Sequence, residues 1–334
     1  MDKAIFNRAR ALKVPAESAA VSPPLPLMDA DDTQPDELAV AMAQVHYAVE
    51  KGDQALLLEV CSRPPPAGST TGGLDLPDGN GWAALHWCGR YDRPELALAL
   101  CVAGAARDPR TTVDQHTPLH IAAMGGHVDV VLTLLHFKAD VSARDSEGVS
   151  ALHWAAQGGH AALIPPLLRA AEDAEAAGKS GGGLEGLRDA ADSAGRVALH
   201  VASAAGHELA AAALMEAGAE PEAPQLRDRR TALHLAAVEG HTGTVECLLG
   251  CGAPAGAVDR RGKTALDLAA AAERYPACVL LAEAQGVLCP IPKPLSVVEL
   301  TDDGIDEPPI EEDQDEQEEQ EDAGGIDADL ELDA

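Results

Sequence analysis

Short apolar segments recur along the chain at a nearly constant interval, and each contains a leucine with the same kind of polar residue directly after it. Histidine follows the first five leucines, and Asp267 follows the sixth. The leucines are 34, 33, 47, 34 and 33 residues apart, at Leu85, Leu119, Leu152, Leu199, Leu233 and Leu266. A period in this range predicts a solenoid, in which similar units stack and contact only their neighbours.

The second copy shows the elements predicted for one unit. Thr117 and Pro118 suit the first turn of a short helix, because a hydroxyl can cap free backbone N–H groups and proline has none to satisfy. Ala122 and Ala123 leave room for close helix packing. Glycines at 126, 159, 206 and 240 permit a bend before a second apolar stretch, and the leucines of that stretch fill the layer between units.

This layout resembles the ankyrin repeat. The resemblance is carried by Thr-Pro-Leu-His at 117–120, Gly-His at 126–127 and Ala-Asp-Val at 139–141, and it extends over roughly residues 78–286. It implies an all-α solenoid, an ankyrin-repeat array of helix-turn-helix units with β-hairpin-like fingers.

The two ends of the array depart from the pattern. A degenerate leading unit is expected, with helices at 40–45 and 54–61 and a turn at 51–53. In the last unit Asp267, Glu273 and Arg274 replace the histidine and the Gly-His turn. Terminal repeats are usually atypical because one of their faces meets water. We therefore expect six clear repeats plus an N-terminal cap repeat.

The predicted organisation is a flexible segment at 1–35, the array at 36–290, and a linker with a disordered acidic tail at 291–334. From Asp302 onward there are 17 Asp or Glu residues and no Lys or Arg, so this stretch cannot bury enough apolar surface to fold. The long interval carries 14 extra residues within 170–191, predicted to be an exposed loop. The alternative is a partner-specific lip over the concave face. Pro165 and Pro166 are expected to delay or kink the helix before it.

Composition agrees with thin helical layers and argues against an enzyme. The chain is 46% hydrophobic but only 2% aromatic, so alanine and leucine form the core. Its seven cysteines show no CxxC spacing and are expected to be reduced thiols of an intracellular protein. Residues 178–180 resemble the end of a phosphate-binding loop, but Asp173 stands where that loop requires glycine. Enzymatic activity and a cofactor are not expected.

Nine of the twelve histidines belong to the repeat pattern. Successive copies should lie roughly 8–10 Å apart, one helix-packing distance, whereas the ligand atoms of one metal lie about 4 Å apart or less. We interpret these histidines as structural and expect no metal site.

Ankyrin proteins usually bind partners through the finger tips and the exposed positions of the first helix. Carried onto this chain, the resemblance implies the following partner-binding residues: Asn80, Trp82, Arg90, Tyr91, Asp114, His116, Met124, Glu147, Val149, Gln157, Ser193, Arg196, Arg227, Arg230, Val238, Glu239, Arg260, Arg261 and Lys263. The second and fifth fingers are less well defined, because Gln115 and Arg229 stand where glycine is expected.

Two features of this surface have alternative interpretations. Trp82 and Tyr91 are either anchors of a binding hot spot or filling at the junction with the N-terminal cap. The basic residues on the last two fingers either bind an acidic ligand or are solvated decoration. They are Arg227, Arg229, Arg230, Arg260, Arg261 and Lys263.

The acidic tail has three interpretations: a solubilising segment, an intramolecular competitor lying over the basic fingers, or a docking arm for a basic protein. Just before it, Val297, Val298 and Leu300 resemble a SUMO-interacting motif, which would add as a strand to a small domain. The net charge of −31 disfavours nucleic acid as a partner.

We therefore expect a monomeric, non-enzymatic adaptor or scaffold that binds a protein on the concave ankyrin surface. One alternative is a regulatory inhibitor or carrier that masks a basic client segment. That layout is similar to the inhibitors of NF-κB, whose paired-serine motif is absent here. Another is the substrate-recognition module of a ubiquitin ligase, although no recruiting box is evident. Without a secretory signal or a long apolar run, a soluble intracellular protein of the cytoplasm or nucleus is expected.

Overall fold

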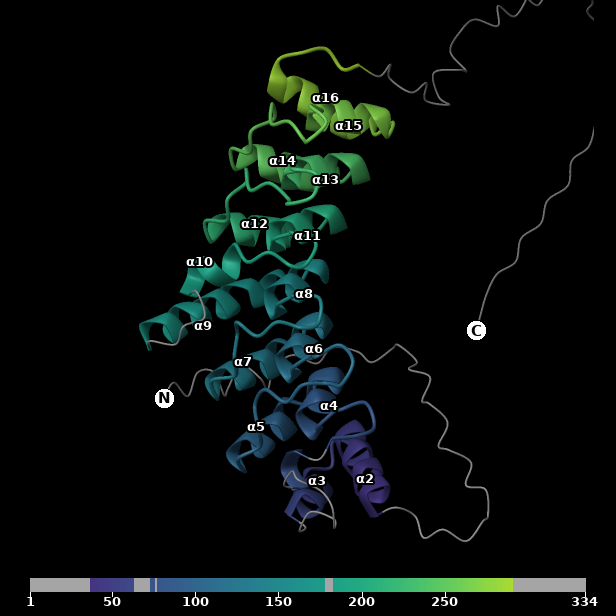
Figure 1. Ribbon diagram of the computed structural model, residues 1–334, viewed down its shortest axis with the longest axis vertical. Helices are drawn as coiled ribbons and strands as arrows, with labels where there is room; N and C mark the ends of the chain where they lie inside the picture. Colours follow the sequence, from purple (N-terminus) through teal and green to yellow (C-terminus); the bar gives the residue numbers. More distant parts are fainter. Residues whose placement is uncertain (1–36, 63–72, 76, 178–182, 291–334) are drawn as a thin grey trace, which may run out of the picture. The chain divides into compact units, whose positions relative to one another are not determined.

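The computed structural model describes residues 37–62, 73–75, 77–177 and 183–290, and there the helices stack in successive pairs (Figure 1). The first helices of the six repeats are α4 (Ala84–Tyr91), α6 (Pro118–Gly125), α8 (Ala151–Gln157), α11 (Ala198–Ala205), α13 (Ala232–Glu239) and α15 (Ala265–Ala271). The second helices are α5 (Pro94–Val102), α7 (Val128–His136), α9 (Ile164–Ala176), α12 (Glu208–Glu216), α14 (Thr242–Gly250) and α16 (Tyr275–Gln285).

Each helix packs against its equivalent in the next repeat, which gives two parallel columns (Figure 1). This arrangement confirms the all-α solenoid. Within the described ranges the fingers contain no strand, only an isolated bridge between Val258 and Thr264. The predicted segments 1–35 and 291–334, including the SUMO-like motif, lie outside the described residues.

A leading helix pair precedes the six repeats. Helices α2 (Glu37–Lys51) and α3 (Gln54–Ser62) contain the predicted helices at 40–45 and 54–61. They pack on α4 and α5 and so continue the two columns, before a short 3-10 turn, η1 (Gly73–Asp75). The turn predicted at 51–53 is shorter than expected, because Lys51 is the last residue of α2. Gly52, with φ +76°, makes the turn.

The core between repeats is built from leucine and alanine. Leu119, Leu152 and Leu233 of the first helices are fully buried, as are Leu134 and Leu214 of the second helices. The alanine pairs of α6, α8 and α13 are buried as well. Small side chains let the backbones of neighbouring helices approach closely, so a thin layer reaches interior packing density without aromatic residues.

In the middle repeats, the turn between the two helices favours glycine for two separate reasons. Gly206 has φ +78°, a left-handed conformation that L side chains rarely adopt. In addition, a Cβ at Gly206 would lie 2.5 Å from Nδ1 of His241 in the next repeat. That histidine donates from Nε2 to the carbonyl oxygen of Ala204, 3.1 Å away. His160 and His207 make the same bond to Met124 and Gln157.

The first and last repeats replace this histidine with arginine. Arg93 donates to the carbonyls of Val49 and Glu50 at 3.2 and 2.7 Å, and Arg274 donates to that of Val238 at 3.2 Å. Although the last repeat lacks the Gly-His pattern, Arg274 therefore still makes the hydrogen bond to the preceding repeat. Glu273 also keeps the left-handed backbone, with φ +56°.

The prediction of an exposed loop at 170–191 is corrected for the described residues, of which 170–176 and 183–188 are helical. A 3-10 turn, η2 (Ala161–Leu163), precedes α9, which has proline in its first turn and runs on to Ala176. Helix α10 (Gly183–Arg188) then packs on α9, and Leu187 is buried. The two helices lie on the second-helix side of the stack (Figure 1). The alternative of a lip over the concave face is therefore also wrong for these residues.

We predict that Gly206→Ala destabilises the array more than Gly252→Ala. Both glycines have left-handed backbones (φ +78° and +87°), so both substitutions carry the strain of that conformation, about 1–2 kcal/mol. Only Gly206 faces a neighbour, the His241 ring, whereas nothing lies within 4 Å of a Cβ at Gly252. Urea unfolding of both variants measures the difference, and equal losses would contradict a steric role for His241.

Candidate partner-binding surface

A tight turn, here called a finger, precedes each first helix, at residues 78–82, 111–116, 145–149, 192–196, 225–230 and 259–263. In four fingers an aspartate opens the turn and its Oδ1 accepts two backbone N–H groups. Asp145 accepts those of Glu147 (2.9 Å) and Val149 (2.8 Å). The same pattern occurs at Asp78, Asp192 and Asp259. Each of these turns also contains a glycine with positive φ, such as Gly148.

The second and fifth fingers form a related turn from other residues. The hydroxyl of Thr111 accepts the N–H of His116 at 2.9 Å, and the N–H of Gln225 donates to the carbonyl of Arg230 at 2.9 Å. Gln115 and Arg229 take the left-handed conformation, with φ +57° and +54°. The tips of these two fingers are less well defined from the sequence. Each nevertheless contains one residue in the left-handed conformation, as the other four fingers do.

Neighbouring fingers are hydrogen-bonded to one another through the backbone. One bond joins each successive pair: Thr112 N–H to Asn80 O (3.0 Å), Ser146 to Asp114 (2.9 Å), Ser193 to Glu147 (2.9 Å), Leu226 to Gly195 (3.3 Å) and Arg260 to Asp228 (2.8 Å). The row has no interruption from the first finger to the sixth. The side chains at the tips are therefore held at a fixed spacing along one edge of the array.

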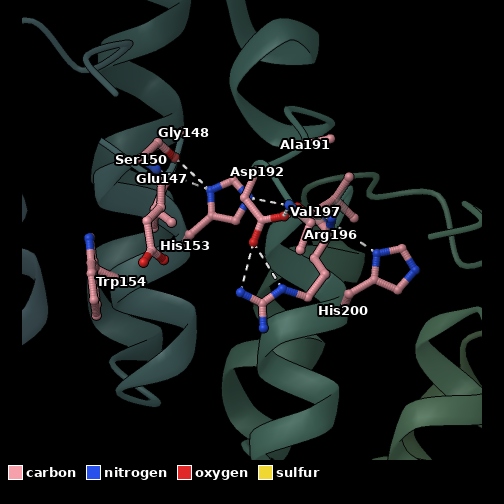
Figure 2. Close-up of polar contacts among 12 residues, drawn as sticks. Glu147, Gly148, Ser150, His153, Trp154, Ala191, Asp192, Arg196, Val197 and His200 are labelled. Carbon is pink, nitrogen blue, oxygen red and sulfur yellow. Dashed lines mark hydrogen bonds and ion pairs between the residues drawn. The ribbon is translucent and has the colours of Figure 1, made fainter. Parts of the chain in front are cut away.

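A buried histidine in each of the first five repeats joins its own helix to the finger that follows. Its Nδ1 accepts a backbone N–H three residues earlier, at 2.9–3.4 Å. Its Nε2 lies 2.9–3.2 Å from a carbonyl oxygen in or just before the next finger. Figure 2 shows this for His153, which bonds to Ser150 and to the backbone of Arg196. The five are His86, His120, His153, His200 and His234.

These partners fix the protonation state of the five histidines. A carbonyl oxygen can only accept, so the proton lies on Nε2, and Nδ1 must be unprotonated to accept the N–H. Burial supports the same state, because it disfavours the charged ring. It lowers the pKa of His86, His120 and His200 to about 4, and also lowers the pKa of His153 and His234.

Helix capping differs from the sequence prediction. Thr117 was expected to cap backbone N–H groups, but its hydroxyl lies 2.9 Å from Nδ1 of His120 and makes no such bond. Only in the last repeat does the hydroxyl act as predicted, where Thr264 accepts the N–H of Asp267 at 3.2 Å. The Asp267 carboxylate in turn accepts the Thr264 N–H at 2.9 Å. The Asp267 carboxylate thus accepts the backbone N–H that a histidine Nδ1 accepts in the other five repeats. No further finger follows this repeat in the described array.

Most of the predicted binding residues are at least partly exposed. The exposed ones are Asn80, Arg90, Asp114, Met124, Glu147, Gln157, Ser193, Arg227, Glu239, Arg260, Arg261 and Lys263. Half-buried are Trp82, Tyr91, His116, Arg196, Arg230 and Val238. Val149 is buried, with 6% of its surface exposed, and its inclusion is therefore corrected: it packs inside the third finger and offers no contact to a partner.

The aromatic residues of the first repeat form a cluster with the leading helix pair. The rings of Trp82 and Trp87 lie 4.6 Å apart, and His46 of α2 lies 4.3 Å from Trp87. Tyr91 is hydrogen-bonded to His46 through its hydroxyl, at 2.9 Å. These contacts support the interpretation of Trp82 and Tyr91 as the junction with the N-terminal cap. Trp87 and His46 were not identified from sequence, because the repeat pattern assigns neither of them to the surface.

Two half-buried basic residues of the surface are ion-paired with finger aspartates, Arg196 within its own finger and Arg230 with the finger that follows. Arg196 lies 2.8 Å from the Asp192 carboxylate (Figure 2), and Arg196 is a cause of the lowered pKa of Asp192. Nε of Arg230 lies 4.0 Å from Asp259. His116 similarly lies 3.4 Å from Asp145, which also accepts the indole N–H of Trp154 at 3.2 Å. These side chains support the fingers and are only partly available to a partner.

No group of three or more His, Cys, Asp or Glu residues within the described ranges could hold a metal ion. None of the helices described is both long enough and apolar enough to cross a membrane.

We predict that the array loses stability as the pH falls from about 6.5 to 4. An unfolded histidine has a pKa near 6.5 and His86, His120 and His200 have pKa values of about 4, so the unfolded chain binds more protons in this range. The full contribution is present above pH 6.5, and about 2 kcal/mol per histidine is lost at pH 5. Urea unfolding at pH 7.5 and 5 measures this loss.

His200→Gln provides the test of cause. It removes one titrating group, so its stability should fall less between these two pH values than that of the native chain. The matched control is His136→Gln, at an exposed residue outside the row, which should leave the pH dependence unchanged. Identical pH dependence in all three proteins would contradict the role given to the buried histidines.

We predict that Tyr91→Phe lowers the free energy of unfolding by about 1 kcal/mol, because it removes the hydrogen bond to His46. Tyr47→Phe, at an exposed tyrosine on the same helix α2, is the control and should change little. If Tyr91→Phe left stability intact but weakened partner binding, the residue would instead be a hot-spot anchor.

Comparison with known proteins agrees with this architecture. The family model for ankyrin repeats (3 copies) matches residues 45–145, 85–178 and 199–289, more than half of the chain. The chain is also similar to the putative palmitoyltransferase ZDHHC13 of Danio rerio, with 30% identity over 106 residues. That segment is 32% of this chain and only 16% of the relative's length. Ankyrin repeats are protein–protein interaction modules, and this chain belongs to the ankyrin-repeat family.

Proposed function

We propose that the protein is a non-enzymatic adaptor or scaffold that holds a partner protein against its finger tips and the exposed ends of its first helices. The observation that carries this proposal is the uninterrupted row of backbone hydrogen bonds between the six fingers. A surface held in this way is already ordered before binding, so little conformational freedom is lost when a partner associates. Residues 36–290 act as one binding unit in this proposal.

The surface offers side chains whose polar groups are available to a partner. Asn80, Asp114, Glu147 and Ser193 project from consecutive fingers and are exposed. Their backbones make the finger-to-finger bonds, so the side chains are not needed to hold the turns.

The two alternative roles receive less support. An inhibitor or carrier that masks a basic client depends on the acidic residues after 301, which lie outside the described residues. A ubiquitin-ligase module would need a recruiting motif, and none is evident in the sequence.

We predict that Asp114→Lys with Glu147→Lys abolishes partner capture. These substitutions reverse two charges at neighbouring finger tips, where mismatched charges oppose binding. The matched control is Glu172→Lys with Glu246→Lys, which makes the same charge change at exposed positions of the second helices. Affinity capture followed by mass spectrometry compares both variants with the native chain. Partners retained by the finger variant but lost by the control would place the binding surface on the opposite side.

A further inference from the structure

We propose that the last two fingers bind an acidic segment of the partner protein. This inference rests on the proposed function and adds the chemistry of what is bound. The binding group, called here the basic finger patch, consists of five exposed side chains: Arg227, Arg229, Arg260, Arg261 and Lys263.

The backbone holds the two halves of the patch together. The N–H of Arg260 on the sixth finger donates to the carbonyl of Asp228 on the fifth, at 2.8 Å. The guanidinium of Arg260 also reaches back to the carbonyl of Arg227, at 3.5 Å. The exposed cations of both fingers are therefore neighbours on one surface, and their spacing is set by the array.

The carboxylates of the same fingers do not neutralise the patch. Asp259 is buried: its Oδ1 accepts the N–H groups of Arg261 and Lys263 at 2.7 and 2.9 Å, and its Oδ2 faces Arg230. The Asp259 carboxylate is therefore occupied by the backbone of its own turn and by Arg230, a basic residue outside the patch. Asp228 is the one exposed carboxylate among residues 225–230 and 259–263. Five exposed positive charges thus face solvent beside a single exposed negative charge.

Arginines in or directly before the earlier fingers have their side chains engaged with the protein itself, which distinguishes the basic finger patch from repeat decoration. Arg110 donates to the carbonyl of Arg144 at 2.7 Å, and Arg144 donates to those of Gly148 and Ala191 at 2.9 and 3.0 Å. Arg196 pairs with Asp192. By contrast, the side chains of four patch residues have no hydrogen bond or ion pair within the part of the chain that the structure describes: Arg227, Arg229, Arg261 and Lys263.

The chemistry of the patch favours carboxylates of a protein segment. Guanidinium groups bind carboxylates through paired N–H donors in a fixed geometry. Carboxylates two or three residues apart in an extended chain lie roughly 7–10 Å from each other, which matches the roughly 8–10 Å between neighbouring helix layers. An extended segment running along the fingers can therefore place one carboxylate on each finger.

The acidity of the rest of the protein limits what else can bind. The second helices α12 and α14 expose Glu208, Glu216 and Glu246, and the chain carries a net charge of −31. A nucleic acid, with negative charge along its whole length, is repelled by a chain of this charge. A short acidic peptide contacts only the patch, because charges more than about 8 Å away are largely screened at physiological salt.

The test uses the full chain and a fluorescent peptide with four glutamates at alternate positions. Fluorescence anisotropy measures its affinity for the native protein, for the patch variant R229Q/R260Q/R261Q and for the control R107Q/K138Q/R169Q. The control removes the same charge from exposed residues elsewhere. Urea unfolding first confirms that both variants fold. We expect the patch variant to bind at least about tenfold more weakly, and the control to bind as the native chain does.

Three results would overturn the inference: no binding of the peptide to the native chain, equal weakening in the patch variant and the control, or tighter binding of a single-stranded oligonucleotide of the same charge. Its failure is separable from that of the proposed function. If the patch variant binds the peptide normally while the Asp114→Lys, Glu147→Lys variant still loses its partner, the inference falls and the binding surface stands.

Discussion

The architecture depends on a buried histidine that must remain neutral. In five repeats one nitrogen of the ring accepts the N–H at the start of its own helix, and the other donates to the backbone at the next finger. Only the Nε2-protonated, uncharged ring satisfies both bonds. A single side chain therefore fixes where a helix begins and where the next finger lies. Asp267 supplies the first of these bonds, at the repeat after which the described array has no further finger.

A second row of contacts ties the repeats together on the side of the inter-helix turns. There a histidine, or an arginine at the two ends, bonds to the end of the preceding first helix. The histidine rings lie directly against the turn glycines, as His241 does against Gly206. Neighbouring repeats are therefore connected in three ways: through the backbone bonds between fingers, through the buried histidine and through the contact at the inter-helix turn. The finger surface is consequently preordered, and under the proposed function binding specificity resides in side chains that the array does not need.

The sequence predicts the repeats, the helix pairs and the leading cap because these follow from local pattern and turn chemistry. It does not reveal the second role of His120, since the carbonyl that it binds belongs to Ala143, 23 residues further on. The insertion was predicted to be a loop because it is rich in glycine, yet packing on α9 stabilises α10 and buries Leu187. Val149 fits the exposed register of its finger but is covered by neighbouring residues. In each case a contact distant in sequence decides the outcome.

The most direct test of this account is the protonation state of the repeat histidines in the folded protein. Nitrogen-15 NMR of histidine-labelled chain at pH 5.5 distinguishes the two neutral tautomers from the charged ring. The account predicts that His86, His120 and His200 are neutral with the proton on Nε2, consistent with pKa values of about 4. Charged rings at these positions in the folded protein, titrating near pH 6.5, would contradict it.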